Sequence, residues 1–430
     1  MNKEKNRFQL AKEKRDKETL VLAEKHIISS SNKYFNMLKD FCKLSKNLYN
    51  HANFLVRQEF MNNNKWLRFQ DIDKILRTDT QYPDYKNMPT AQSAQQILKV
   101  LDTNWSSFFK AIKSWTANKS KFNGRPKQPK YLNKNGYFEL ILTNQEARLK
   151  DNIISFPKVF NGFSINPHFL NNENTKNSKL QQVVIHFDGV NIVIEVIYRI
   201  QKPQIKENNN RIMGIDVGVT NILTCATNTG DLPIIFSGGP AKSINQYYNK
   251  EKAKLHSCAY KRNKQKSTKR IKKLTKKRNY KMNDYIHKVS RKVIDYCEEH
   301  DITTIIIGKN KQWKVSPPFS KTENQNFVSI PLAVIIDKIV YKAKMKGITV
   351  FTHEESYTSG TSFLDDEKPI KKFYNKNRRK KRGLFISNTG IKINADVNAA
   401  LQIIKKQIPQ VIFFDNIKKA ILNPIIQKVA

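Results

Sequence analysis

Two stretches in the first third of the chain carry apolar residues at helical spacing. Between Asn36 and Phe60 the apolar side chains recur every three, four or seven positions, at Leu38, Phe41, Leu48, Ala52 and Leu55. Between Ala94 and Trp115 they recur every three or four, at Leu98, Leu101, Trp105, Phe108 and Ile112. Such a stripe marks one face of an amphipathic helix. We therefore expect a small helical domain whose aromatic residues pack in its core rather than stack on bases.

Short runs rich in β-branched residues follow, divided by polar turns. They are FELIL (Phe138–Leu142), NIISF (Asn152–Phe156), KLQQVVIHF (Lys179–Phe187) and NIVIEVIYRI (Asn191–Ile200). This pattern predicts an antiparallel β-barrel or a small sheet that ends near Gln201. The polar, Asn-rich segment that follows, Lys202–Asn210, is the best domain boundary in the chain.

Beyond residue 210 the pattern becomes one of strands separated by helices. Three strands are expected in succession at RIMGIDVGV, NILTCAT and PIIFSGG. A long helical insert precedes a fourth strand at Ile302–Gly308, and a helix at Ile330–Lys346 precedes a fifth at Ile348–Glu355. A further insert and a last helix complete the chain. This order is typical of an RNase H-like α/β domain.

The charge of the chain indicates a polyanionic partner. Lys and Arg number 78 against 36 Asp and Glu, which gives a net charge of +42. An excess of this size repels itself unless a polyanion neutralises it, and nucleic acid is the obvious candidate. A ribosome-associated protein or a lysine-rich proteome would produce a similar bias.

Basic residues gather in three segments that we expect to contact phosphate. The first is a Gly- and Pro-containing linker, Lys119–Tyr131; the second is the helical insert, where Lys250–Lys281 holds fifteen Lys or Arg and one acid, Glu251. A third basic run includes Lys376, Lys380 and Lys381. The candidate nucleic-acid-binding residues are Lys121, Arg125, Lys127, Lys130, Lys261, Arg262, Lys269, Arg270, Lys276, Lys277, Arg278, Arg378, Arg379 and Arg382.

Neither a membrane segment nor a cysteine framework is apparent. The charged opening MNKEKNRFQLAKEKRDKE has no apolar core, and no apolar run is long enough to span a bilayer, so we expect a cytoplasmic protein without a membrane partner. The four cysteines, Cys42, Cys225, Cys258 and Cys297, form no C-x-x-C pair, which argues against disulfides and a zinc ribbon. They are expected to be ordinary thiols.

Two aspartates are candidates for metal-dependent phosphodiester hydrolysis. That chemistry needs carboxylates that converge from different elements on divalent cations about 3.5–4 Å apart. Asp216 lies in GIDVGVTN at the end of a strand, where Gly214 and Gly218 leave room for a close backbone approach. Asp396 lies in NADVNAAL at the start of the last helix, a position where Asp often serves only as an N-cap. In this order of elements the pair indicates a nuclease site.

The sequence resembles the TnpB family, the insertion-sequence nucleases ancestral to type V CRISPR effectors, along nearly its whole length. The N-terminal resemblance is carried by EKHIISSSNKYFNMLKDFCKLSKNLYNHANFLVRQEF, by VLDTNWSSFFKAIKSW and by KFNGRPKQPKY. The C-terminal resemblance is carried by IIIGKNKQWK, NQNFVSIP, EESYTSGTSFLD and NADVNAALQII.

The resemblance implies an α+β multidomain protein in which a β-barrel (WED) holds an inserted helical REC domain and precedes an RNase H-like RuvC domain. The implied domains are the first WED part at 1–32, REC at 33–130, and the second WED part with the linker at 131–210. RuvC follows at 211–355 with a basic helical insert at 241–300, and resumes at 393–430. A target-nucleic-acid-binding insert without zinc occupies 356–392.

The resemblance also implies an RNA-guided DNA endonuclease. Its partners would be a guide RNA from the right end of a transposon and double-stranded target DNA beside an adjacent motif, and its cofactor two Mg²⁺ ions. Asp216 matches the first RuvC acid and Asp396 the third. The implied catalytic set is Asp216, Glu354, Glu355 and Asp396, with Asp216, Glu355 and Asp396 as the metal ligands.

The second acid departs from the usual pattern. Most relatives end the fourth strand in Glu, whereas this chain has Gly308; a version of the family that resembles it carries EESYTS downstream instead. Neighbouring strands lie roughly 4.8 Å apart, so a glutamate after the fifth strand could reach over Gly308. Successive side chains of a strand point to opposite faces, so only one of Glu354 and Glu355 can point toward the metal site. The sequence does not decide which. If both were solvated, the enzyme would be crippled.

The insert departs as well. Many relatives hold a zinc ribbon there, but residues 356–390 contain no cysteine, so no zinc is expected. Tyr357 or Phe363 could fill the space that the zinc ion occupies in those relatives. We expect both side chains to pack in the core.

Three alternatives remain open at this point. A compact type V CRISPR-like effector would share the chemistry and take its guide from an array transcript. A nuclease-inactive RNA-guided repressor would bind DNA without cutting it, and an unguided nucleic-acid chaperone would bind any RNA equally well.

Overall fold

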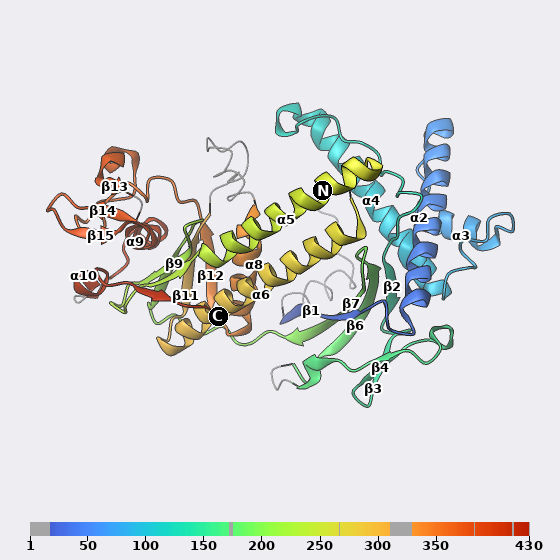
Figure 1. The fold of residues 1–430 in the computed structure, drawn as a ribbon, viewed down its shortest axis with the longest axis horizontal. Helices are drawn as coiled ribbons and strands as arrows, with labels where there is room; N and C mark the ends of the chain where they lie inside the picture. Colours follow the sequence, from blue (N-terminus) through green and yellow to red (C-terminus); the bar gives the residue numbers. More distant parts are fainter. Residues whose placement is uncertain are drawn as a thin grey trace, which may run out of the picture. The chain divides into compact units, whose positions relative to one another are not determined.

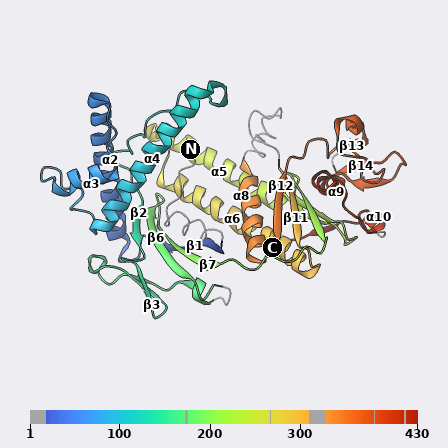
Figure 2. The same ribbon diagram turned by 180° about the vertical axis from the view of Figure 1, so that it is seen from behind.

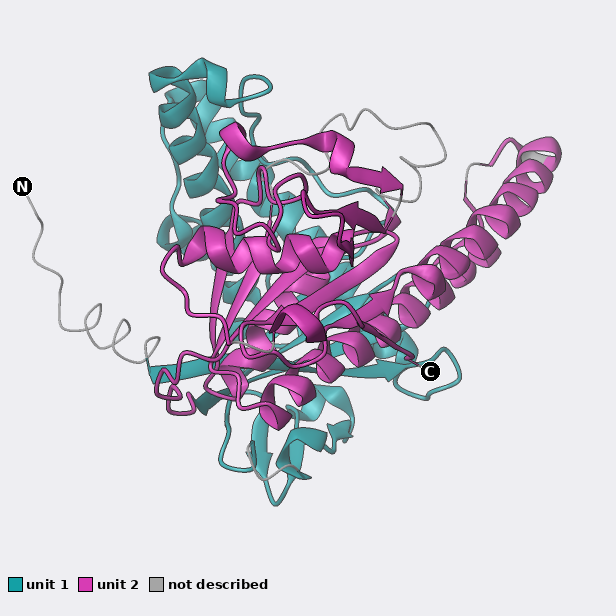
Figure 3. Ribbon diagram, turned by 90° about the vertical axis from the view of Figure 1, so that its left-hand side faces the viewer, with its two compact units in different colours: residues 1–201 teal, residues 202–430 magenta. Residues whose placement is uncertain are grey.

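The computed structural model describes residues 18–171, 175–265, 267–309, 329–381, 383–414 and 417–429. The chain divides into two compact units, residues 1–201 and residues 202–430 (Figure 3). The division falls between Gln201 and Lys202, at the start of the polar segment Lys202–Asn210. The first seventeen residues of the expected WED part, residues 310–314 of the IIIGKNKQWK block, residues 324–328 of the NQNFVSIP block, and Arg382 lie outside the described residues.

The helical part of unit 1 consists of α2 (Phe35–Asn63), α3 (Phe69–Thr78) and α4 (Ala91–Ala117). The two long helices bury the apolar faces expected from the sequence, with Leu38, Leu48, Leu98, Leu101 and Trp105 fully buried. Trp105 also contacts Phe60, Phe108 and Phe109 in an aromatic cluster, so its expected core role is confirmed. The short α3 was not anticipated, because only Ile72 and Leu76 give it an apolar face.

The β part of unit 1 is an antiparallel sheet in the order β1-β7-β6-β2. Its strands are β1 (Thr19–Ile28), β2 (Leu140–Thr143), β6 (Lys179–Phe187) and β7 (Ile192–Gln201). A second sheet contains β3 (Arg148–Lys150), β4 (Ile153–Ser155) and β5 (Ser164–Ile165), and short 3-10 turns are η1 (Lys119–Lys121), η2 (Lys158–Phe160) and η3 (His168–Asn171). Of the two expected alternatives, the described residues match the small sheet, with β1 and β2 at its edges. Sequence patterning missed β1, whose exposed face carries apolar Val21 and Ile27.

Unit 2 is built on a six-stranded mixed sheet in the order β12-β11-β8-β9-β10-β16. Its strands are β8 (Ile212–Val217), β9 (Asn221–Thr227), β10 (Ile234–Ser237), β11 (Thr304–Gly308), β12 (Thr349–His353) and β16 (Ile425–Gln427). The first five of these are the strands expected from the sequence. β11 pairs in parallel with both β8 and β12, so the carboxyl ends of these three strands lie at one edge of the sheet.

Helices cover both faces of this sheet. On one face α6 (Lys269–Glu299) and α8 (Leu332–Met345) pack on β8, β9 and β11 through a core that includes Ile286, Val293 and Ile335. On the other face α9 (Ala395–Gln407) lies against β8, and a Cβ on Gly214 would come 2.1 Å from the carbonyl oxygen of Ala400. Gly214 thus permits the close approach that the sequence suggested. The basic insert is a hairpin in which α5 (Gly239–Asn263) runs beside α6 (Figures 1 and 2).

The segment between β12 and α9 forms a small lobe on the α9 face. It contains η4 (Lys371–Phe373), η5 (Lys376–Arg378) and an antiparallel sheet of β13 (Arg379–Lys381), β14 (Leu384–Ile386) and β15 (Lys392–Asn394). Phe363 and Phe385 join the core formed by α9, and a short helix, α10 (Ile417–Ala420), contributes Ile417. Among the described residues, none of the helices combines the length and the apolar character needed to cross a membrane.

Candidate active site

The candidate acids meet at the edge of the unit 2 sheet where parallel strands end. Asp216 is the fifth residue of β8, Gly308 is the last residue of β11, and Glu355 follows the end of β12 by two residues. The register pairs Ile307 with Ile215, so Gly308 lies beside Asp216. Parallel pairing aligns these three strand ends, and loops at such an edge commonly carry functional groups.

Glu355 occupies space that a side chain at position 308 would otherwise fill. A Cβ built on Gly308 would lie 2.5 Å from Oε2 of Glu355 and 2.6 Å from Cδ1 of Ile403. Real Cβ atoms do not approach other atoms so closely. The glycine at the end of β11 therefore leaves the space that the carboxylate of Glu355 occupies after β12, as the spacing of neighbouring strands suggested.

Glu354 faces elsewhere. Its carboxylate accepts hydrogen bonds from the backbone N–H and the hydroxyl of Ser356, and it pairs with Nζ of Lys406 at 3.0 Å. The Ser356 and Lys406 hydrogen bonds lower the pKa of Glu354. The structure thus brings Glu355 to the other acids and leaves Glu354 in a surface ion pair.

Asp396 reaches the site because another residue caps its helix. Oδ1 of Asn394 accepts hydrogen bonds from the backbone N–H groups of Asp396 and Val397 at the start of α9. The carboxylate of Asp396 is consequently not used as a cap. Its Oδ2 accepts a hydrogen bond from Nδ2 of Asn221 at 2.8 Å, and its Oδ1 from Nη2 of Arg379 at 2.9 Å.

The acids repel one another electrostatically. Burial raises the pKa of Asp216 well above its usual value, and the negative charges of Asp396 and Glu355 raise it further. Arg379 and the backbone N–H of Val217 offset part of this effect. Each carboxylate disfavours the charged form of its neighbours, so a bound cation stabilises the cluster. Its oxygen donors suit a hard divalent ion such as Mg²⁺ or Mn²⁺.

A cavity of about 620 Å³ opens over these acids. Its lining combines the end of β8 and the turn after it with residues 355–359, Tyr374, Arg379 and Asp396. Tyr357 lines this cavity and is 38% exposed, packed edge-on against Tyr374. Core packing was therefore the wrong expectation for Tyr357, because a left-handed backbone (φ 69°) turns this residue out of the core. Phe363 is buried against Phe413, as expected for a core residue.

Most of the expected phosphate-binding residues are on the surface. The exposed ones are Lys121, Arg125, Lys127, Lys130, Lys261, Arg262, Lys269, Arg270, Lys277 and Arg379; Lys276 is half-buried.

Two arginines are instead engaged within the protein. Arg278 donates hydrogen bonds to the side chain of Asn245 and the carbonyl of Ser329, and burial lowers its pKa. Arg378 pairs with Glu367 at 2.6 Å.

Sequence reasoning overlooked Asn221 and Asn394. Asn221 stands five residues after Asp216, at the start of the next strand, where a tight turn brings it back to the acids. The motif GIDVGVTN contains Asn221, but the sequence alone assigns no function to this residue. The sequence marks Arg379 only as one cation in a basic run, because its contact with Asp396 has no local signature.

The cysteines fit their expected ordinary roles. Cys42, Cys225 and Cys297 are buried and Cys258 is exposed, and all four are free thiols.

Comparisons with known proteins found two matching family models, a related protein and a structure of similar fold. Residues 195–314 match the OrfB_IS605 family, described as "Probable transposase", and residues 334–403 match the Cas12f1-like TNB domain. The chain is 23% identical over 420 residues to the TnpB-like protein ORF457 of Acidianus two-tailed virus, with 87% of this chain and 84% of that protein covered. The fold is similar to that in the cryo-EM structure of the Cas12f1–sgRNA–target DNA complex, with a TM-score of 0.54, 16% identity, and 86% and 82% of the two chains covered.

Proposed function

We propose that this chain, a member of the TnpB family, is an RNA-guided DNA endonuclease that hydrolyses target DNA at the RuvC-type site formed by Asp216, Glu355 and Asp396. The observation that carries the proposal is the convergence of these three carboxylates from β8, the β12 loop and α9 on one cavity. A scaffold that only bound DNA would have no need to gather mutually repelling, half-buried acids beside Gly308.

The residues of the site have different roles. Asp216, Glu355 and Asp396 would hold divalent cations, most simply two Mg²⁺, which would activate water and stabilise the leaving oxygen. Asn221 orients the carboxylate of Asp396. Arg379 neutralises Asp396 in the absence of metal and stands at the cavity, where its guanidinium can turn to a phosphate oxygen.

Nucleic-acid partners are supported by charge and by the related proteins. The Cas12f1 structure of similar fold is a complex with a single guide RNA and target DNA. In such a system base pairing with the guide reads the sequence, while the protein contacts the backbone and a short adjacent motif. Exposed cations in the 119–131 linker and on the α5–α6 hairpin provide the required backbone contacts. The small lobe between β12 and α9 then acts as a cysteine-free target-binding insert.

The decisive experiment is a cleavage assay of the Asp216→Ala variant with its guide RNA and Mg²⁺. We expect cleavage to be abolished while RNA binding is unchanged, because the substitution removes an acid of the cavity and no surface cation. Asp284→Ala, which alters an exposed aspartate on α6, is the matched control and should cut normally. Persistent cleavage by Asp216→Ala, or loss of its RNA binding, would contradict the assignment.

Sequencing the RNA that copurifies with the protein identifies the guide. An RNA that ends in sequence from a transposon flank supports the TnpB-type system proposed here. Repeat-spacer RNA would instead indicate the compact type V CRISPR-like effector. Guide-dependent DNA binding without any Mg²⁺-dependent product would indicate the repressor, and indiscriminate RNA binding the chaperone.

A further inference from the structure

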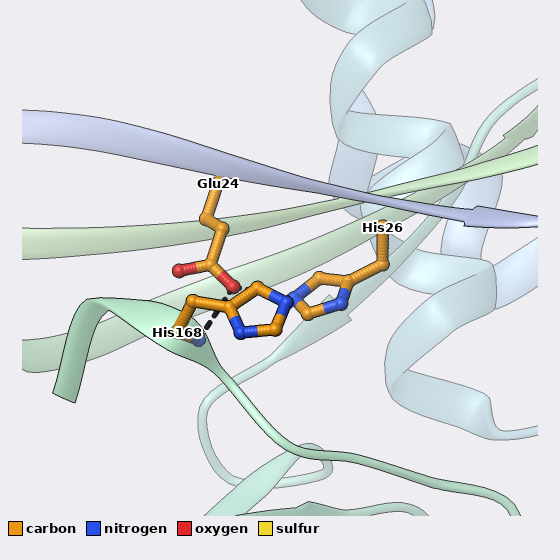
Figure 4. Close-up of side chains that lie close together, drawn as sticks. All are labelled: Glu24, His26 and His168. Atoms are coloured by element: carbon orange, nitrogen blue, oxygen red, sulfur yellow. Dashed lines mark hydrogen bonds and ion pairs between the residues drawn. The ribbon is translucent and has the colours of Figure 1, made fainter. Parts of the chain in front are cut away.

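Unit 1 contains a cluster of metal-binding side chains that the proposed nuclease site does not use. Glu24 and His26 lie two residues apart on β1, so both project from the same face of the strand. His168 begins η3, and its imidazole ring lies beside the side chains of Glu24 and His26 (Figure 4). One ligand atom from each of the three side chains lies within 4.8 Å of the others.

The carboxylate of Glu24 is held in place by the backbone of η3. Its Oε1 accepts a hydrogen bond from the N–H of His168 at 2.7 Å (Figure 4). Its Oε2 accepts one from the N–H of Phe169 at 2.6 Å. Each carboxylate oxygen has a second lone pair, so these bonds orient Glu24 and still leave it able to bind a cation. A fixed carboxylate of this kind lowers the ordering cost of a metal site.

The two histidines complete the donor set. Nε2 of His26 is buried and lies 2.6 Å from Oε1 of Glu24, yet it makes no hydrogen bond of acceptable geometry with the described residues. The ring of His168 is exposed and stacks on that of His26, with their centroids 5.2 Å apart. The short distance between this buried nitrogen and the Glu24 oxygen places both atoms where one cation could contact them.

We propose that Glu24, His26 and His168 form a binding site for one divalent transition-metal ion of the Zn²⁺ class. Two imidazoles and one carboxylate favour a borderline ion such as Zn²⁺ or Co²⁺ over Mg²⁺, which prefers oxygen ligands alone. The site therefore differs in chemistry from the carboxylate cluster of unit 2.

The ring of His168 must turn to close the site. Tetrahedral ligands about 2.1 Å from a shared ion lie about 3.4 Å apart, whereas the present ligand atoms are spread over up to 4.8 Å and the two rings are stacked. His168 can supply this movement, because its ring is exposed and lies at the start of a short turn. The bound ion would join β1, an edge strand of the unit 1 sheet, to η3, which lies more than a hundred residues away in sequence. Such a link stabilises the folded unit, because the unfolded chain lacks a formed site.

The test is a Co²⁺ titration of the full-length Asp216→Ala protein, freed of metal by chelation, followed by displacement with Zn²⁺. The Asp216→Ala background weakens ion binding at the carboxylate cluster. We expect one equivalent of Co²⁺ to produce ligand-field absorption that Zn²⁺ abolishes. Zn²⁺ should also raise the melting temperature.

Added to this background, His168→Ala should weaken Co²⁺ binding by at least about tenfold, since loss of even an outer partner of a metal ligand costs about 10–100-fold. His168 is exposed, so this variant should fold. His168→Cys should restore binding through a thiolate, and His256→Ala, which removes an exposed histidine of α5, should leave it unchanged. Equal Co²⁺ signals in His168→Ala and His256→Ala, or no signal in the parent, would overturn the proposal. Neither result depends on RNA or DNA, so the nuclease proposal is tested separately.

Discussion

Gly308 and Glu355 share one volume at the edge of the unit 2 sheet. The glycine ends β11, and the carboxylate of Glu355 lies where a side chain at position 308 would begin, 2.5 Å from the built Cβ. In the proposed nuclease site, Glu355 on the loop after the fifth strand replaces the acid expected at the end of the fourth strand. The exchange requires the glycine as much as the glutamate.

Gly308→Ala should therefore impair the nuclease without unfolding it. The added methyl group would push Glu355 away from Asp216 and Asp396, and a displacement of about 1 Å in a catalytic group can cost about 10²-fold in rate. Single-turnover cleavage with saturating guide RNA measures the loss. Gly239→Ala is the matched control, because a Cβ there would meet only the hydroxyl oxygen of Ser237, at 3.2 Å. Full activity in Gly308→Ala would mean that Glu355 does not need its present position.

The two neighbouring glutamates should respond differently to the same substitution. Glu355→Gln keeps the size of the side chain but removes a charged oxygen ligand, so we expect cleavage to fall by at least about 10²-fold. Glu354→Gln weakens only the surface contacts with Ser356 and Lys406, which contribute about 1 kcal/mol or less. Cleavage rates measured over a range of Mg²⁺ concentrations compare the two variants. A larger defect in Glu354→Gln would reverse the assignment.

Removing the charge of Asp216 should stabilise the metal-free protein at neutral pH. The pKa of Asp216 is raised in the folded state, so between the unfolded and folded pKa values the native state binds more protons, and stability falls as pH rises. Asp216→Asn avoids this loss and should raise the melting temperature by about 2–4 °C for each kcal/mol relieved.

Differential scanning fluorimetry in EDTA measures this effect. The gain should shrink as the pH is lowered through the folded pKa, because the wild-type carboxyl group then becomes neutral as well. Added Mg²⁺ should reverse the order by stabilising the wild type alone. A lower melting temperature for Asp216→Asn in EDTA at neutral pH would contradict the electrostatic account.

Arg379 should affect metal binding and turnover in opposite directions. Its guanidinium is bonded to Oδ1 of Asp396, where it competes with a cation for that oxygen. Arg379→Gln should lower the Mg²⁺ concentration needed for half-maximal cleavage, yet reduce the rate at saturating Mg²⁺ by about 10²-fold through loss of a charged donor at the phosphate. Lys380→Gln, one residue further along β13, is the control. If the two variants have the same Mg²⁺ dependence, Arg379 is only one member of a basic surface.

The sequence by itself determined most of the local elements and singled out Asp216 and Asp396 as the first and third candidate acids. The long helices α2 and α4 follow from apolar periodicity, because each buries one continuous face that local spacing reveals. The strands β6 to β9 follow from short runs rich in β-branched and apolar residues. Asp216 and Asp396 follow from motifs contained within about eight residues each. The strand β1 escaped notice because its outward face is partly apolar, which weakens the alternation.

Only the tertiary structure decided which groups meet. The choice of Glu355 over Glu354 depends on how the loop leaves β12 and on the space beside Gly308, and both are set by strand packing. The release of Asp396 from helix capping depends on Asn394, and the contact of Asp396 with Arg379 depends on the fold of the small lobe. The meeting of His168 with β1 is of the same kind. Contacts between residues remote in sequence arise from register and packing across elements, and a pattern read along one element carries no record of them.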